Sequence, residues 1–202
     1  APAAALSEPE LQKISQYLKE GGRMMVLFNY ASLKQTTGLE PVLQRWGVNV
    51  LPATVQDPKN TVTGQAVVVR HFSDHHPIVA SLAQLSLQMV LPRPVLKVNR
   101  TDPPANAPLA TELAFASPDS VLADERNETP RAYSLMAAVE QKPVAGVANP
   151  RGNTRIVVTG DSVFLGNYYI EGAANRDFLN SAANWLLDRA QLVEGIGPRP
   201  VT

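Results

Sequence analysis

The sequence predicts an α/β domain with a mainly parallel, doubly wound sheet, and three stretches carry this prediction. Two helix-then-strand patterns follow one another within the first fifty residues. A third apolar run begins at Ile156 and is followed by a polar loop and a helix pattern over 176–189. Helices that alternate with short apolar strands are typical of sheets covered on both faces. We therefore predict three layers, in which strands 24–28, 48–51 and 156–160 share one sheet.

The first unit begins with a helix start signal. Ser7 and Glu10 have the spacing of a capping box, and the apolar residues after them repeat at helical spacing. This pattern predicts a helix over 8–20, which a pair of glycines ends. The apolar run 24–28 then predicts a buried strand. A helix followed by a strand is half of a βαβ unit, so we expect the strand before it to lie outside this chain.

The second unit repeats the first. Residues 39–46 have apolar side chains on one helical face, with Trp46 among them, and Gly47 can end the helix. Residues 48–51 then form another short apolar run. Two such units in succession favour a parallel sheet with right-handed crossovers.

The middle of the chain is rich in proline. Its prolines divide it into short pieces and make long helices improbable. Strand patterns occur at 65–70, 95–98 and 133–140, and Pro77 can open one short helix between them. We therefore expect residues 60–145 to be a β-rich elaboration within a single domain that covers the whole chain, 1–202.

A candidate ligand site is predicted where the parallel strands end. Ligands of open α/β sheets bind outside the carboxyl ends of the strands, and polar residues follow the runs 24–28 and 156–160 there. The last helix begins at the same edge, with Asn175 or Asp177 as its N-cap. The candidate ligand-binding residues are Asn29, Tyr30, Asp161, Ser162, Asn175 and Arg176.

The chemistry of these side chains suits a neutral, hydroxyl-rich ligand such as a saccharide. A phosphate site would call for a glycine-rich turn with Lys or several Arg residues. Each residue also has a structural interpretation: Asp161 and Asn175 can cap turns or helices, and Arg176 can face solvent. The sequence contains no G-x-S-x-G, G-x-G-x-x-G or P-loop motif, and we expect no catalytic residues and no cofactor.

The three histidines lie together in residues 71–76 and suggest two further hypotheses. They could bind a divalent metal, or one of them could act with Asp161 in a hydrolase of small molecules or glycans. The alternative is that they are a polar lead-in to the Pro77 helix, with Ser73, Asp74 or His76 as its cap. We expect the capping role and no metal site.

Composition excludes several classes of function. The 202 residues carry 18 basic and 18 acidic side chains, so no net field attracts nucleic acid. Cysteine is absent, which excludes disulfides and thiol nucleophiles. No apolar run is long enough to span a bilayer, so the chain as given is expected to be soluble. We expect it to be a domain excised from a longer protein.

An ordered series of short motifs resembles the GldG-type auxiliary component of ABC transport systems linked to gliding motility. The resemblance covers nearly the whole chain and is most specific at its two ends. The series runs through residues 6–11, 17–18, 21–22, 24–28, 43–47, Asp57, 76–78, 158–165, 175–180 and 184–186.

This resemblance implies a fold, a role and partners. The fold would be three-layered and Rossmann-like or glutamine-amidotransferase-like, in a group some of whose members are suspected of binding sugars. An amidotransferase needs a cysteine nucleophile, which this chain lacks. The resemblance implies a non-catalytic, extracytoplasmic (periplasmic) domain of a membrane-anchored protein. That protein would work in binding or scaffolding with a permease and an ATPase from other polypeptides.

Overall fold

A computed structural model describes residues 4–123, 129–143, 146 and 150–189. The α-helices of these residues are α1 (Glu8–Lys19), α2 (Leu39–Arg45), α3 (Pro77–Ala80) and α4 (Asn175–Leu186), and the short 3-10 helices are η1 (Tyr30–Ser32) and η2 (Val163–Leu165). The strands are β1 (Arg23–Leu27), β2 (Val48–Val50), β3 (Val55–Gln56), β4 (Thr61–Val62), β5 (Ala66–Val69), β6 (His71–Phe72), β7 (Leu87–Val90), β8 (Val95–Lys97), β9 (Leu109–Phe115), β10 (Val121–Leu122), β11 (Ser134–Gln141) and β12 (Thr154–Thr159).

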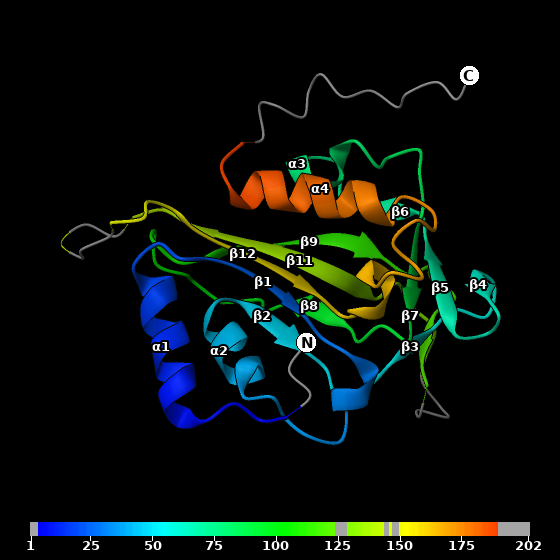
Figure 1. Cartoon of the computed structure of the whole chain (residues 1–202), viewed down its shortest axis with the longest axis horizontal. Coiled ribbons are helices and arrows are strands. Elements are labelled where there is room, and N and C mark those ends of the chain that lie inside the picture. Colours follow the sequence, from blue (N-terminus) through cyan, green and yellow to red (C-terminus); the bar gives the residue numbers. More distant parts are fainter. Residues whose placement is uncertain (1–3, 124–128, 144–145, 147–149, 190–202) are drawn as a thin grey trace.

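A mixed sheet of five strands forms the centre of the molecule, in the order β1-β12-β11-β9-β6 (Figure 1). β1 and β12 are parallel neighbours, with Leu27 opposite Thr159 at their carboxyl ends. The other three pairs, β12 with β11, β11 with β9 and β9 with β6, are antiparallel. The prediction that 24–28 and 156–160 share one sheet is confirmed. The prediction of a mainly parallel sheet is wrong.

The predicted strand 48–51 is also misplaced. β2 pairs antiparallel with β8 in a separate two-stranded sheet, with Asn49 opposite Leu96. An apolar run of three or four residues fits a buried strand of either direction equally well, so its pattern does not reveal its partner.

The middle of the chain contributes to the centre of the fold as well as to its periphery. β9 and β11 lie in the central sheet, whereas β4, β5 and β7 form a three-stranded antiparallel sheet and β3 pairs with β10. The predicted strands at 65–70, 95–98 and 133–140 correspond to β5, β8 and β11, and the helix at Pro77 is α3.

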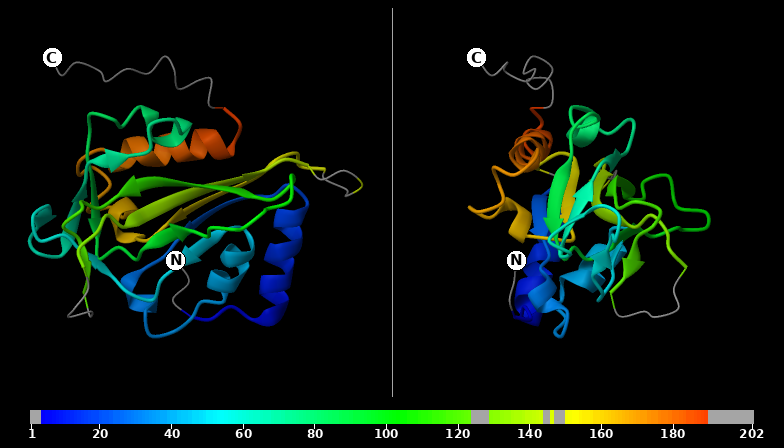
Figure 2. Two further views of the ribbon diagram at one scale, coloured as in Figure 1. Left: turned by 180° about the vertical axis from the view of Figure 1, so that it is seen from behind. Right: turned by 90° about the vertical axis from the view of Figure 1, so that its right-hand side faces the viewer.

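Apolar side chains cover both faces of the central sheet. α1 and α2 lie on one side of it and α3 and α4 on the other (Figures 1 and 2). On β12, Ile156 and Val158 belong to the cluster with α1 and α2, whereas Val157 belongs to the cluster with α4. Successive residues of a strand point to opposite faces, so this strand is buried on both sides, as its β-branched run predicts.

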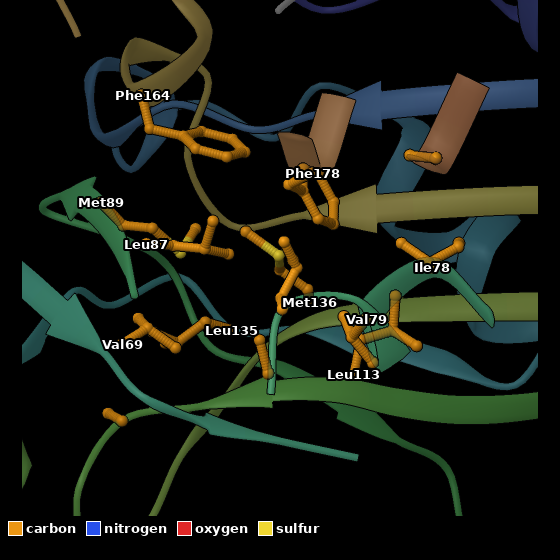
Figure 3. Close-up of a cluster of buried hydrophobic side chains, with 14 of the residues drawn as sticks. Val69, Ile78, Val79, Leu87, Met89, Leu113, Leu135, Met136, Phe164 and Phe178 are labelled. Carbon is orange, nitrogen blue, oxygen red and sulfur yellow. The ribbon is translucent and has the colours of Figure 1, made fainter. Parts of the chain in front are cut away.

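The α4-side core joins the central sheet to the three-stranded sheet. Figure 3 shows its side chains converging from these sheets, from the helices and from η2. All ten labelled side chains are fully buried: Val69, Ile78, Val79, Leu87, Met89, Leu113, Leu135, Met136, Phe164 and Phe178. Trp46, which lies on the apolar face predicted for residues 39–46, is buried, and so are Phe178 and Trp185 of α4.

The predicted N-terminal cap is confirmed for α1 and is wrong for α4. Ser7 and Glu10 form the predicted capping box of α1, with Ser7 N donating to Glu10 Oε2 over 2.8 Å. The N-cap of α4 is Ala174, not Asn175 or Asp177. Asn175 is the first residue of that helix, and its side chain bonds elsewhere.

Candidate functional site

Residues predicted to line a ligand crevice gather where β1 and β12 end. The two strands are parallel and in register up to Leu27 and Thr159, so the residues after them emerge at the same edge. Asn29 Nδ2 donates a hydrogen bond of 2.8 Å to Ser162 Oγ across this edge. Asn29 Oδ1 also accepts from Ala31 N and caps η1.

Asp161 is fully buried, and its carboxylate bonds to the backbone. Oδ2 accepts from Val90 N at 2.7 Å and from Phe164 N at 3.1 Å, while Oδ1 accepts from Val163 N at 2.6 Å. Burial raises the pKa of Asp161 to about 6, and these backbone hydrogen bonds act in the opposite direction. The side chain therefore fastens β7 to η2.

Asn175 is fully buried and plays a parallel role. Its Oδ1 accepts from Gln88 N at 3.0 Å, and its Nδ2 donates to Gln88 O at 3.1 Å. Nδ2 also lies within hydrogen-bonding distance of Phe164 O at 3.1 Å and Tyr169 O at 3.0 Å. One amide thus joins β7, η2, the following loop and the start of α4.

Together these two side chains protect the open edge of β7. β7 pairs with β5 on one side only, so the backbone groups of Gln88 and Val90 on the other side need partners. Asn175 bonds to both backbone groups of Gln88, and Asp161 bonds to the N–H of Val90. Their structural interpretation is therefore the one that the geometry supports.

Tyr30 and Arg176 lie at the surface. Tyr30 is 42% exposed, and Arg176 forms an ion pair with Glu171 in which both side chains are more than half exposed. Exposed pairs of this kind contribute little to stability, about 0 to 1 kcal/mol. These are the members of the predicted set whose side chains remain available to a partner.

The chain itself occupies the space next to the strand ends. Arg93 N donates to Gly160 O at 2.8 Å, so the connection between β7 and β8 crosses the carboxyl end of β12. A Cβ atom at position 160 would overlap the Arg93 carbonyl oxygen, which explains why glycine stands there. The predicted crevice is filled at this point by residues of the same chain.

Arg93 is the residue of this region that sequence reasoning missed. Its side chain is buried, with Nε donating to Leu51 O at 2.9 Å and NH1 lying 3.3 Å from Glu40 Oε1. The guanidinium also lies over the Phe28 ring, 4.8 Å from its centroid. Burial lowers the pKa of Arg93, and Glu40 opposes that shift. The available signal was one cation between two prolines, Pro92 and Pro94, in an otherwise apolar stretch.

The histidine cluster does not join Asp161. His76 Nδ1 accepts from Ile78 N at 3.3 Å, so His76 is the one of the three predicted candidates that caps α3. Its ring lies 5.1 Å from that of Trp185. Burial lowers the pKa of His76 to about 4. Since Asp161 bonds to backbone N–H groups, the proton-sharing pair required by the hydrolase hypothesis is absent among the described residues.

Within residues 4–123, 129–143, 146 and 150–189, no group of three or more His, Asp or Glu side chains is placed to hold a metal ion. None of the helices in that same part of the chain is long and apolar enough to cross a membrane.

Two surface grooves are lined by residues other than the six predicted ones, although Ala174 and Asp177 of the first groove flank Asn175 and Arg176 in the sequence. One has a volume of about 350 Å³ and is lined by Arg70, Gln84, Leu85, Ser86, Ala173, Ala174 and Asp177. The other, of about 510 Å³, lies beside the loop between β8 and β9 and includes Lys97 and Arg100 in its lining.

The fold and this edge define a mixed α/β domain whose strand-end polar residues hold its parts together. A family model described as an ABC-type uncharacterized transport system, that of the ABC transport auxiliary proteins, matches residues 1–193. The chain belongs to this family. The resemblance found in the sequence is confirmed at the level of the ABC transport auxiliary family.

A solved structure and the curated proteins complete the comparison. The chain is similar to the structure titled "mmIFT52 N-terminal domain", with a TM-score of 0.65 and 14% identity, over 99% of this chain and 76% of that one. At this identity the likeness shows the fold alone. Comparison with curated proteins gives no significant match.

Proposed function

We propose that this domain is a non-catalytic binding or scaffolding part of an ABC-type transport system. Family membership supports the auxiliary role and association with transporter components. The proposal that the domain is non-catalytic rests on the structural role of Asp161 and Asn175. Both groups occupy the predicted site, and both are buried and bonded to backbone rather than presented to a substrate.

The proposal includes a location and partners. The domain would lie on the extracytoplasmic face of the membrane, in a protein whose permease and ATPase partners are separate polypeptides. A link with gliding motility, which the resemblance to GldG-type proteins suggests, is part of the same proposal.

We place the docking surface at the carboxyl ends of β1 and β12. Tyr30 follows β1 and Tyr168 follows η2, and they are 42% and 87% exposed. Tyrosine is enriched at protein interfaces because it combines a large apolar ring with a polar tip. Asn175 bonds to the carbonyl of Tyr169, so the loop that carries Tyr168 is fastened next to it.

Co-purification of the full-length protein with its permease and ATPase tests this surface. The change Tyr168→Ala should reduce capture at least about tenfold, as expected for an aromatic side chain central to an interface. Leu109→Ala is the matched control, because Leu109 is 64% exposed and begins β9 at the opposite end of the sheet. Equal capture by both variants and the unmodified protein would contradict the proposed surface.

Saccharide binding at the same edge stays a prediction. With Asp161 and Asn175 buried, the side chains left to contact a sugar are exposed ones such as Tyr30 and Arg176. Calorimetry against an oligosaccharide panel tests it, with binding weakened by Tyr30→Ala and Arg176→Ala as the expected result. Absence of binding to any member of the panel would leave protein docking as the proposed role.

A further inference from the structure

β1 presents an unpaired edge, because it is the outer strand of the central sheet. Gly22 O accepts from Arg155 N, and Phe28 N donates to Thr159 O, so alternate residues of this stretch bond to β12. The residues between them turn their backbone groups away from β12. Those residues are Arg23, Met25 and Leu27.

The first position of this edge is already closed by a side chain. The Tyr17 hydroxyl accepts from Arg23 N at 2.9 Å and donates to Arg23 O at 3.0 Å. No described residue bonds to the outward backbone groups of Met25 and Leu27. Two N–H and two C=O groups therefore remain for an added strand.

Two other sheet edges among the described residues are protected. β6, at the far side of the central sheet, is only two residues long, and Asn175 and Asp161 cover the outer edge of β7. Short edge strands and covered edges are ordinary ways of preventing unwanted strand pairing. β1 has five residues and neither form of protection beyond Tyr17.

The side chains around this edge indicate what kind of strand fits. Met24 packs against the core on the α1 side, and Met25 packs against the core on the α4 side. These two residues and Leu27 are only half-buried. A strand laid beside β1 would cover apolar surface on both faces of the sheet, so it should be apolar on both of its own faces.

The course of the chain indicates where that strand comes from. Leu6 N donates to Thr37 O, and Thr37 lies in the connection that follows β1 and η1. The chain therefore approaches α1 from the side on which β1 ends, as Figure 1 also shows. A strand that led into α1 along this edge would run parallel to β1 and complete a βαβ unit.

We propose that an extended apolar segment that precedes residue 1 in the full-length protein pairs in parallel with β1 through the backbone of Met25 and Leu27. The segment would attach the domain to the preceding polypeptide by main-chain hydrogen bonds rather than by a free linker. This inference does not depend on the transport role.

Hydrogen exchange at single residues tests the pairing. In the protein of residues 1–202, the amides of Met25 and Leu27 should exchange at least about 100-fold faster than that of Val26, which faces β12. In the full-length protein they should slow to within about tenfold of Val26. Fast exchange in both proteins, or slow exchange in both, would overturn the proposal.

A proline variant separates pairing from other causes of protection. Leu27→Pro removes the outward N–H and leaves the bonds to β12 in place, because proline is tolerated at a strand edge. In the full-length protein it should restore fast exchange at Met25, whereas the control Leu27→Ala should not. Protection that arises only when permease and ATPase are added would assign the edge to a partner and overturn the proposal.

Discussion

At the residue scale, buried polar side chains do the work of linking separate parts of the chain. Asn175 and Asp161 join β7 to the loops after β12, and Arg93 joins the β7–β8 connection to α2 through Glu40. Polar groups at such positions are costly unless every one is bonded, so each should be sensitive to truncation.

Asn175→Ala should destabilise the protein by about 3 kcal/mol, because it leaves buried backbone groups of β7 without partners. Asn180→Ala is the matched control: Asn180 lies on the exposed face of the same helix, and its loss should change stability by less than about 0.5 kcal/mol. Urea unfolding monitored by tryptophan fluorescence measures both. Equal effects of the two changes would contradict the bridging role of Asn175.

Two buried titratable groups should oppose each other as pH changes. The folded protein raises the pKa of Asp161 from 3.8 to about 6, so the stability that this residue contributes is present below pH 4 and is lost as pH rises through about 6. It lowers the pKa of His76 from 6.5 to about 4, so the stability linked to His76 is present above pH 6.5 and is lost as pH falls through about 4.

Single variants should separate the contributions of Asp161 and His76 to the pH dependence of the unfolding free energy. Asp161→Asn should leave a protein whose unfolding free energy rises from pH 4 to pH 6.5, because Asp161 then no longer opposes the His76 effect. His76→Asn supplies a side-chain oxygen that can cap α3 in place of Nδ1, and it should leave a protein whose unfolding free energy falls over the same range. Unfolding titrations at four or five pH values measure this. The same slope in both variants would show that other groups control the pH dependence.

At the element scale, local sequence signals predicted most helices and strands, but they did not predict which strands pair with one another. The capping box of α1 and the β-branched run of β12 depend only on residues that are close together in the sequence, so both were predictable. The antiparallel pairing of β2 with β8 depends on residues about fifty positions apart. β9 was missed because its start follows a proline-rich loop and its burial pattern lacks the simple alternation of a two-faced strand.

In the predicted site, too, local sequence determines some features and tertiary packing determines others. The position of Asn29, Ser162 and Asp161 at one edge follows from two parallel strands and was predictable from the sequence. The use of Asp161 and Asn175 to hold β7 was not, because Gln88 and Val90 reach them only through tertiary packing. Polar residues after a strand have the same appearance in a sequence whether they bind a ligand or a neighbouring strand.

The crossing of β12 by the β7–β8 connection gives a prediction at this scale. Gly160→Ala should destabilise the protein by more than about 3 kcal/mol, because the new methyl group meets the Arg93 backbone, which cannot move without disturbing β7. Gly64→Ala is the comparison, since it has free space and only a left-handed backbone, with a cost of about 1 kcal/mol. Thermal unfolding ranks the two, and a smaller loss at position 160 would contradict the close contact.

At the scale of the whole molecule, the domain combines a well-filled interior with exposed aromatic residues at one end. The central sheet is covered on both faces, and the β7–β8 connection occupies the space at the carboxyl end of β12. These features support the docking surface proposed above, and the family supports an auxiliary role in a transport system.

The measurement that tests this account most directly is transport by the reconstituted system with Asp161→Asn, at a temperature where that variant is fully folded. Asparagine keeps one acceptor oxygen for β7 but removes the carboxylate that catalysis or ligand charge would require. We predict transport within about twofold of the unmodified protein, with a lower unfolding midpoint as the only loss. A folded Asp161→Asn protein without transport activity would contradict the structural role and return Asp161 to the functional site.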